Sequence, residues 1–250
     1  MRPLVALLPT LVTLGATALL VLHGPVLQAP DYNHFADRVT FLGIPNARDV
    51  LSNLGFAIVG AWGFLRLGPR RFEPSLHRGW SGYALFLTGV TLTAFGSAYY
   101  HLAPDNGRLL WDRVPIAVAC AGLLVAVRAE ARPAANPRRD AVLLTLAALS
   151  SVAWWHFSDD PPGTGDLRPY LLVQGLPLLL IPIWQWTNET LRADRAWFTA
   201  AVVLYVAAKA AELYDHELFA TLLVLSGHSV KHLLAALAAA VIVTRLDGRS

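Results

Sequence analysis

Long uncharged apolar runs recur from one end of the 250-residue chain to the other, and they constrain its fold more than any other feature. We expect eight of them: about 4–22, 50–67, 81–102, 112–129, 140–157, 169–187, 196–213 and 227–245. Each is close to the ~17–25 residues that a helix needs to cross the ~30 Å hydrocarbon core of a bilayer. Lipid offers the backbone no hydrogen-bond partner, so helices are the expected spanning element. The sequence predicts an all-α, polytopic transmembrane helix bundle.

The composition agrees with this class. Charged residues make up 15% of the chain and hydrophobic residues 55%, and the mean hydropathy is +0.48. A soluble domain carries about a quarter charged residues. The single cysteine, Cys120, lies in an apolar run, which excludes a disulfide framework and a thiolate metal cage. The basic residues are spread over short loops, which is typical of membrane topology, so we predict no nucleic-acid partner.

The first span stands apart from the others. We predict an N-terminal transmembrane helix within residues 1–29 and a seven-helix membrane domain over residues 30–250. A cleaved signal peptide is the alternative for residues 1–29. The following "LHGPVLQAP" has no convincing small-x-small cleavage site, so a retained helix is favoured.

Arginines segregate between alternate loops. With a cytoplasmic N-terminus, the cytoplasmic segments hold 13 arginines and the outer loops hold four. The thirteen are Arg2, Arg66, Arg70, Arg71, Arg78, Arg128, Arg132, Arg138, Arg139, Arg192, Arg195, Arg245 and Arg249, and the four are Arg38, Arg48, Arg108 and Arg168. The positive-inside rule favours this orientation over its inverse. Both termini are therefore predicted to be cytoplasmic.

Three spans carry unusual polar residues at their outer ends. Ser97 and His101 end the third span, Asp112 begins the fourth, and His228 and His232 begin the last. Ionisable groups within spans are costly and usually face a bundle interior or a cavity. Three separate helices thus place such groups at one depth on one side of the membrane, where we expect a functional site.

The spacing of the histidines indicates a metal. His228 and His232 are four residues apart and share one helix face, with Cβ atoms ~5–6 Å apart. If the helices converge, His101 supplies a third imidazole, and a His₃ set with an open fourth position is the layout of a catalytic zinc site. The donor set suits zinc better than calcium or an iron–sulfur cluster.

Each of these residues also has an ordinary structural explanation. A lone histidine at a helix end usually forms an interfacial hydrogen bond, as we expect for His23, His156 and His216. Ser97 alone is typical of close helix packing, and Asp112 alone of a helix N-cap. Only the combination favours a metal site.

The ordered set resembles the alkaline ceramidase family. It consists of Ser97-x-x-x-His101, then Asp112, then His228-x-x-x-His232, and "DVLSNLGF", residues 49–56, is similar to the Ser-Asn motif on the family's first core helix. That family belongs to a superfamily of seven-helix membrane hydrolases that includes the adiponectin and progestin receptors. The resemblance covers about residues 30–246.

The resemblance implies a zinc-dependent amidase that hydrolyses a ceramide-like N-acyl lipid to a fatty acid and a sphingoid-type base. His101, His228 and His232 would correspond to its zinc ligands, and Ser97 and Asp112 to its catalytic helpers. Zinc lowers the pKa of water toward ~7. Asp112 can move the proton to the leaving amine, and Ser97 can donate a hydrogen bond to the developing oxyanion.

Members of the family also bind calcium in an acidic loop before the first core helix. Here Asp37, Asn46 and Asp49 are oxygen donors of the right kind, so the resemblance implies calcium beside the zinc site. The loop lacks the family's compact acidic cluster, however, and Asn46 stands where we align a glutamate. A solvated loop remains the alternative.

Two lysines lie in the last two spans. Lys209 and Glu212 are three apart and predict an intramembrane ion pair. A substrate role for these residues, with Asp215 and Glu217 at the outer rim, stays open. Lys231 is expected to face away from His228 and His232 and to extend toward the interface.

Other functions use some of the same residues. A receptor or regulator would hold zinc as a structural clamp, and a proton-coupled transporter would use Asp112, Lys209 and Glu212 without a metal. A phospholipase would use the same site on an ester. The composition is rich in arginine and poor in lysine, so we expect a multi-pass protein of a bacterial inner membrane. The lipid substrate would lie in that membrane, and the site would lie toward its outer side.

Overall fold

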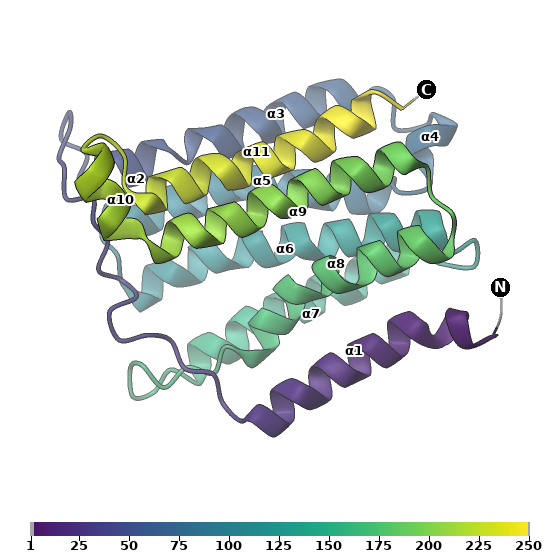
Figure 1. Cartoon of the computed structure of the whole chain (residues 1–250), viewed down its shortest axis with the longest axis horizontal. Helices are drawn as coiled ribbons and strands as arrows, with labels where there is room; N and C mark the ends of the chain where they lie inside the picture. The colour runs from purple at the N-terminus through teal and green to yellow at the C-terminus, as the bar shows by residue number, and fades with distance from the viewer. Residues whose placement is uncertain (1–2, 250) are drawn as a thin grey trace. The chain divides into compact units, whose positions relative to one another are not determined.

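The chain is all-helical. The computed structural model describes residues 3–249 (Figure 1). The helices are α1 (Pro3–His23), α2 (Ala47–Leu51), α3 (Leu54–Leu67), α4 (Pro74–His77), α5 (Trp80–Leu102), α6 (Asn106–Ala131), α7 (Pro137–Phe157), α8 (Arg168–Thr187), α9 (Arg192–Leu213), α10 (Asp215–Leu222) and α11 (Gly227–Asp247). Within residues 3–249 the only β pairing consists of isolated bridges, which confirms the predicted all-α class.

Six helical stretches in the described part of the chain are long and apolar enough to cross a membrane. They are Ala47–Leu67, which combines α2 and α3, and α6, α7, α8, α9 and α11. The first and third predicted spans are helices too, α1 and α5. Leu7–His23 of α1 is apolar as well.

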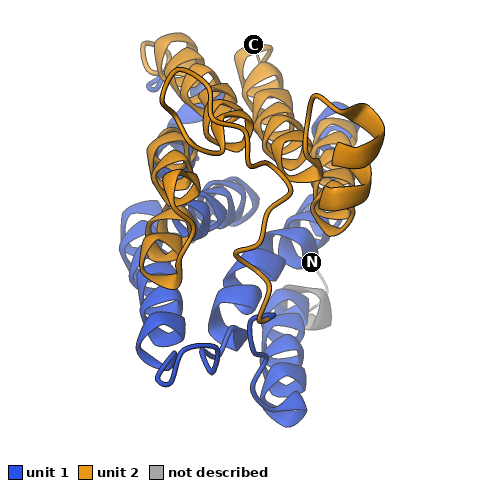
Figure 2. Cartoon of the chain, turned by 90° about the vertical axis from the view of Figure 1, so that its left-hand side faces the viewer, with its two compact units in different colours: residues 1–29, 71–89, 116–195 blue, residues 30–70, 90–115, 196–250 orange. Residues whose placement is uncertain are grey.

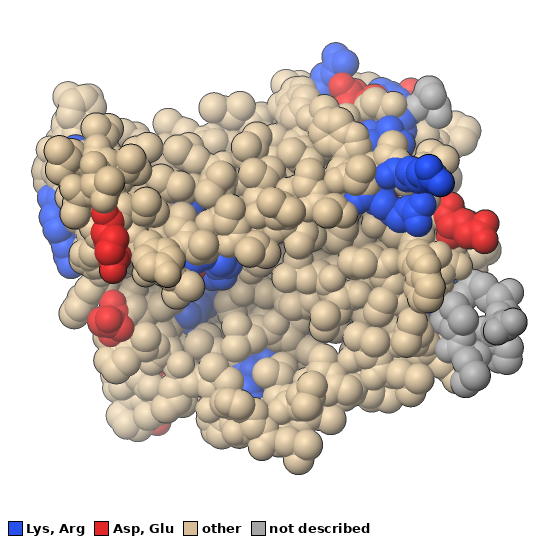
Figure 3. Space-filling model, viewed as in Figure 1, with Lys and Arg blue, Asp and Glu red and all other residues tan. Residues whose placement is uncertain are grey.

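The surface fits a multi-pass membrane protein. Many large apolar side chains point outward; Leu22 is 84% exposed and Leu65 75%. The face drawn in Figure 3 is covered mostly by uncharged residues. Exposed apolar area on this scale is unusual for a soluble monomer and expected where helices face lipid.

One helix boundary and one whole helix differ from the sequence expectation. α6 begins at Asn106, well before the predicted start at residue 112, so Asp112 lies inside the helix and the N-cap explanation for it is wrong. The helix α10 was not predicted. Its short length and its acidic first turn hid it between two apolar spans.

The chain divides into two compact units (Figure 2). Unit 1 comprises residues 1–29, 71–89 and 116–195, and unit 2 comprises residues 30–70, 90–115 and 196–250. The long helices α5 and α6 contribute residues to both. The domain division at residue 30 stays a prediction, and Arg2, one of the predicted cytoplasmic arginines, lies outside the described residues.

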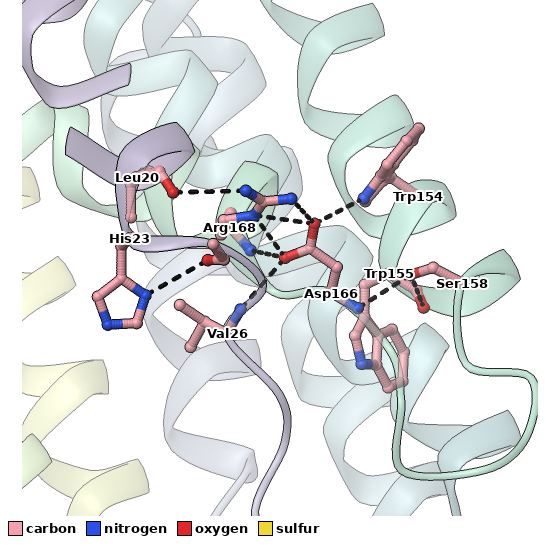
Figure 4. A network of polar contacts seen from close by, with 9 residues as sticks. Leu20, His23, Val26, Trp154, Trp155, Ser158, Asp166 and Arg168 are labelled. Atoms are coloured by element: carbon pink, nitrogen blue, oxygen red, sulfur yellow. Dashed lines mark hydrogen bonds and ion pairs between the residues drawn. The ribbon is translucent and has the colours of Figure 1, made fainter. Parts of the chain in front are cut away.

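In unit 1, α8 packs against α1 and α7. Asp166, 6% exposed, joins them just before α8 (Figure 4). Its carboxylate accepts hydrogen bonds from Arg168 Nε (3.0 Å) and Nη2 (2.8 Å), from Trp154 Nε1 (3.2 Å) and from the Val26 amide (3.4 Å). The guanidinium also reaches the Leu20 carbonyl at the end of α1, at 3.5 Å. One partly buried ion pair therefore links three helices.

These contacts set the pKa of Asp166. Burial raises the pKa, but the hydrogen bonds from Arg168 and from Trp154 and Val26 outweigh burial, and the pKa falls from its usual 3.8 to about 2. The carboxylate is therefore ionised at any ordinary pH.

In unit 2, α3 packs along α11. At one end of this pair Arg66 and Arg70 bind the carboxylate of Asp247, at 3.0 and 3.2 Å. Two glycines allow close approaches nearer the other end. A methyl group at Gly96 of α5 would lie 2.1 Å from the Trp111 carbonyl oxygen of α6, and one at Gly227 would lie 2.2 Å from the Ala211 carbonyl oxygen of α9. Small residues at such crossings let helices pack tightly.

Candidate metal centre

Three histidines from α5 and α11 meet inside unit 2. His101 is 0% exposed, and His228 and His232 are 2% exposed. Each can offer one nitrogen such that all three lie within 4.8 Å of one another. The ring centroids are 4.6 to 5.0 Å apart. The predicted convergence of these residues is confirmed, and the group can hold a metal ion.

The tautomer of His232 follows from its neighbours. Its Nδ1 lies 2.8 Å from Ser52 Oγ, and the Ser52 hydroxyl donates to the Asp49 carbonyl at 2.9 Å. A hydroxyl has one proton to donate, so Ser52 must accept from the Nδ1–H of His232. The Nε2 of His232 therefore carries the lone pair, and it faces Ser97 Oγ at 3.5 Å. Hydrogen bonding at one ring nitrogen commonly prepares the other for a metal.

His101 has no such partner. Neither of its ring nitrogens has a hydrogen-bond partner among the described residues, although both are fully buried. An unpartnered buried polar group costs about 1–3 kcal/mol, and native proteins rarely tolerate one without a purpose. A metal ion would bind one of the two ring nitrogens of His101. Three imidazoles with no thiolate are compatible with zinc. The donor set thus fits the group that the sequence indicates.

A buried carboxylate fixes the start of α11. Asp215 Oδ1 accepts from the His228 amide at 2.8 Å, and Oδ2 accepts from the Ala36 amide at 2.8 Å. The side chain of Ser226 caps the helix by accepting from the Ser229 amide at 2.8 Å. His228 is thereby held in register with the loop before α2.

An aromatic side chain from that loop covers the histidines. The ring centroid of Phe35 lies 4.7 Å from that of His101 and 4.3 Å from that of His228. Tyr100 donates to Asn33 at 2.6 Å, which ties the same loop to α5. Phe35 is 7% exposed, so it shields the imidazoles from water.

The two predicted catalytic helpers lie in different surroundings. Ser97 is 1% exposed and contacts His232. Asp112 is 7% exposed, and no described residue donates a hydrogen bond to its carboxylate. It lies close enough to Lys231 to interact electrostatically. Its acceptor sites are therefore available to another partner.

The three residues of the predicted calcium loop hold the surrounding backbone. Asp37, 0% exposed, accepts from the amides of Val39, Arg48 and Asp49 at 3.0, 2.8 and 3.1 Å. Asn46 donates to the His101 carbonyl at 2.8 Å. These contacts support the histidines, and calcium binding stays a prediction.

Asp49 ties α2 to α11. Its Oδ1 accepts from the hydroxyls of Ser226 and Ser229, both at 2.6 Å. Asn53 donates to the Asp49 carbonyl, four residues earlier in the chain, at 2.8 Å. The polar residues of "DVLSNLGF" thus hold one another and the last helix.

The placement predicted for Lys231 is wrong. Its ammonium lies 3.0 Å from His228 Nε2 and 2.8 Å from Glu212 Oε1, and its side chain is only 17% exposed. The predicted pair of Lys209 and Glu212 is confirmed, at 2.5 Å. Lys231 turns inward because residues three apart on a helix are neighbours and Glu212 lies on the adjoining helix.

Sequence reasoning missed three residues of the site. Ser52 lay inside a recognised motif without a role, Phe35 lay in a loop among other aromatics, and Asp215 was placed at the rim. Of the three, only Ser52 lay in a sequence motif, "DVLSNLGF", that could have indicated its role.

No family model matches the sequence, and no curated protein matches it significantly. The histidine cluster and its surroundings therefore have to carry the functional argument.

Proposed function

We propose that this chain is a zinc-dependent integral membrane amidase that hydrolyses a ceramide-like N-acyl lipid. The observation that carries the proposal is the cluster of three buried histidines, one of which has no partner for either nitrogen. If the three histidines only packed against the protein, the ring nitrogens of His101 would have hydrogen-bond partners. A structural metal would also need a fourth ligand from the protein. The resemblance of Ser97, Asp112 and the histidines to the alkaline ceramidase pattern favours an amide of a lipid.

His101, His228 and His232 would hold the ion. Zinc at neutral imidazoles supplies a Lewis acid that lowers the pKa of water and polarises a carbonyl. The chain's own residues then manage protons and charge. The Ser52 contact keeps the Nε2 lone pair of His232 directed at the site, and Phe35 limits access of bulk water.

Asp112 is the proposed general base and acid. Its carboxylate accepts no hydrogen bond from a described residue, so it can take a proton from the attacking water. It then returns the proton to the amine nitrogen as the carbon–nitrogen bond breaks. Ser97 donates its hydroxyl proton in a hydrogen bond to the carbonyl oxygen as negative charge develops there.

We place the chain in a bacterial inner membrane with both termini in the cytoplasm and with α1 and α5 as further spans. The distribution of arginines among the loops supports this orientation. The histidines then lie near the outer face, where the amide of a lipid would reach them while its acyl chain lies among the helices.

One observation favours a second candidate. Lys209, Glu212 and Lys231 form a continuous chain of ion pairs in the described structure. A proton-coupled transporter would use such a chain together with Asp112. It would need no metal, so metal content separates the two candidates.

The test is the metal content of the detergent-purified protein, by mass spectrometry, beside two variants. The wild-type chain should hold about one zinc, as should the control His77→Ala, whose imidazole is exposed on α4. The double variant His228→Ala/His232→Ala should hold none. Zinc-free wild-type protein that was never exposed to chelator would exclude the amidase and favour the transporter.

A further inference from the structure

Two lysines share one carboxylate beside the histidines. Glu212 Oε2 binds Lys209 at 2.5 Å, and Oε1 binds Lys231 at 2.8 Å. Lys231 then contacts Nε2 of His228 at 3.0 Å. The three residues come from α9 and α11, which are neighbours in Figure 1. The two helices approach closely where Gly227 packs against the Ala211 carbonyl.

The lysines have more hydrogen-bond donors than they use. Each ammonium has three N–H donors. Lys209 and Lys231 each use one donor on Glu212, and Lys231 can donate to the lone pair of His228 Nε2 only while that imidazole binds no metal. At least three donors therefore have no partner among the described residues. The Lys209 side chain is 48% exposed, so a ligand can reach it.

The charges favour an anion. Glu212 and Asp112 balance the two lysines, and both interact electrostatically with Lys231. A zinc ion at neutral imidazoles would add two positive charges beside Lys231, which contacts His228. Hydrogen bonds between charged partners are about twice as strong as neutral ones, and more so away from bulk water.

We propose that Lys209 and Lys231 bind an anionic group of the substrate, a carboxylate or a phosphate, next to the amide that is cleaved. This inference rests on the proposed function, because an N-acyl lipid held at the histidines brings its polar end to these lysines. It narrows the substrate to N-acyl lipids with a negatively charged polar end, such as N-acyl amino acids. A neutral ceramide would leave the lysine donors without a partner.

The experiment compares two ligands with the same chain and the same amide. N-dodecanoylglycine ends in a carboxylate and N-dodecanoylethanolamine in a hydroxyl. Their dissociation constants are measured by calorimetry on the full-length protein in a non-ionic detergent after chelation, so that neither ligand is hydrolysed, and hydrolysis of both is measured separately after loading with zinc. The chelated wild type should bind the glycine conjugate about tenfold more tightly, the effect of one charge-assisted hydrogen bond.

Charge-removing variants locate the effect. Lys209→Gln and Lys231→Gln should each bring the ratio of the two constants close to one. Arg245→Gln removes the same charge from α11 at about 21 Å from Lys231 and should keep the wild-type ratio. Inorganic phosphate should weaken binding of the glycine conjugate alone, which would show that a phosphate also fits.

The outcomes separate this inference from the amidase. A wild-type ratio near one, or an unchanged ratio in both lysine variants, overturns the anion site even if the protein hydrolyses the ethanolamide. A lysine-dependent preference in a protein that hydrolyses neither amide supports the anion site and overturns the amidase. If Lys231→Gln fails to fold by circular dichroism, the more exposed Lys209→Gln decides.

Discussion

The two units contain contrasting polar clusters. In unit 1, both carboxylate oxygens of Asp166 receive hydrogen bonds, and each donor comes from an element that the ion pair links. In unit 2, the nitrogens of His101 and one oxygen of Asp49 are buried without a partner among the described residues. Buried polar groups in native proteins are normally paired. The paired cluster explains stability, and the unpaired one indicates a ligand.

This difference matters because both clusters look alike in the sequence. Each consists of ionisable residues at the edge of an apolar span. Its position in the sequence assigned Arg168 to an outer loop, and the structure adds that its guanidinium pairs with Asp166. The partners of each nitrogen and oxygen, not the presence of charge, separate a structural role from a chemical one.

The largest effect should come from the unpartnered histidine. His101→Ala removes one of three ligands, which should exceed the ~10–100-fold loss typical of a supporting residue, so both zinc retention and turnover should disappear. Zinc content and hydrolysis of an N-acyl lipid are measured on the same preparation, with His77→Ala as the control. A His101→Ala protein that retains zinc would show that the unpartnered nitrogens do not bind the metal. The absence of hydrogen-bond partners would then not distinguish a ligand site from a structural cluster.

Asp112 gives the next largest effect. Asp112→Asn keeps the size of the side chain and removes the proton acceptor, so turnover should fall by about 10²–10⁴-fold while zinc stays bound. Zinc content and kcat measured together test this. Turnover within twofold of wild type would remove Asp112 from the mechanism.

Ser52 belongs to the metal site, but unlike His101 it has hydrogen-bond partners on both sides, His232 and Asp49. Ser52→Ala removes the acceptor for the Nδ1–H of His232, so the imidazole loses its preferred tautomer and orientation. Zinc affinity, measured by competition with a chelator, should fall by about 10–100-fold. Ser158→Ala is the matched control, since the same hydroxyl loss in unit 1 touches only the Asp166 amide and a carbonyl. Equal zinc affinity in both variants would show that the Ser52 contact serves only packing.

The fold was largely predictable because apolar runs of bilayer length allow little besides helices. The same reasoning brought His101, His228 and His232 together, since residues four apart share a helix face and costly groups avoid lipid. It failed for Lys231, whose direction depends on how its helix packs beside Glu212 of the preceding long helix. It also missed Phe35 and Asp215, because a loop's course over a site follows from contacts that no periodicity encodes.

The smallest effect should come from the paired cluster. Asp166→Asn keeps the shape of the side chain but weakens its bonds to Arg168, so the protein should lose about 2 kcal/mol of stability, measured by thermal unfolding in detergent. Its zinc content should equal that of the wild type, because the residue belongs to the structural cluster. Loss of zinc together with retained thermal stability would reverse the roles assigned to the two clusters.

The pH dependence of that loss follows from the pKa of Asp166. The folded pKa of about 2 lies below the unfolded value of 3.8, so the ionised pair stabilises the fold fully above the unfolded value and progressively less as pH falls toward the folded one. The stability difference between wild type and Asp166→Asn should therefore be constant near neutral pH and shrink between about pH 4 and pH 2. Taking the difference cancels the titration of other carboxylates. A difference that stays constant down to pH 2 would mean that the asparagine loses packing and not an ion pair, and the linkage of α1, α7 and α8 would then depend on shape alone.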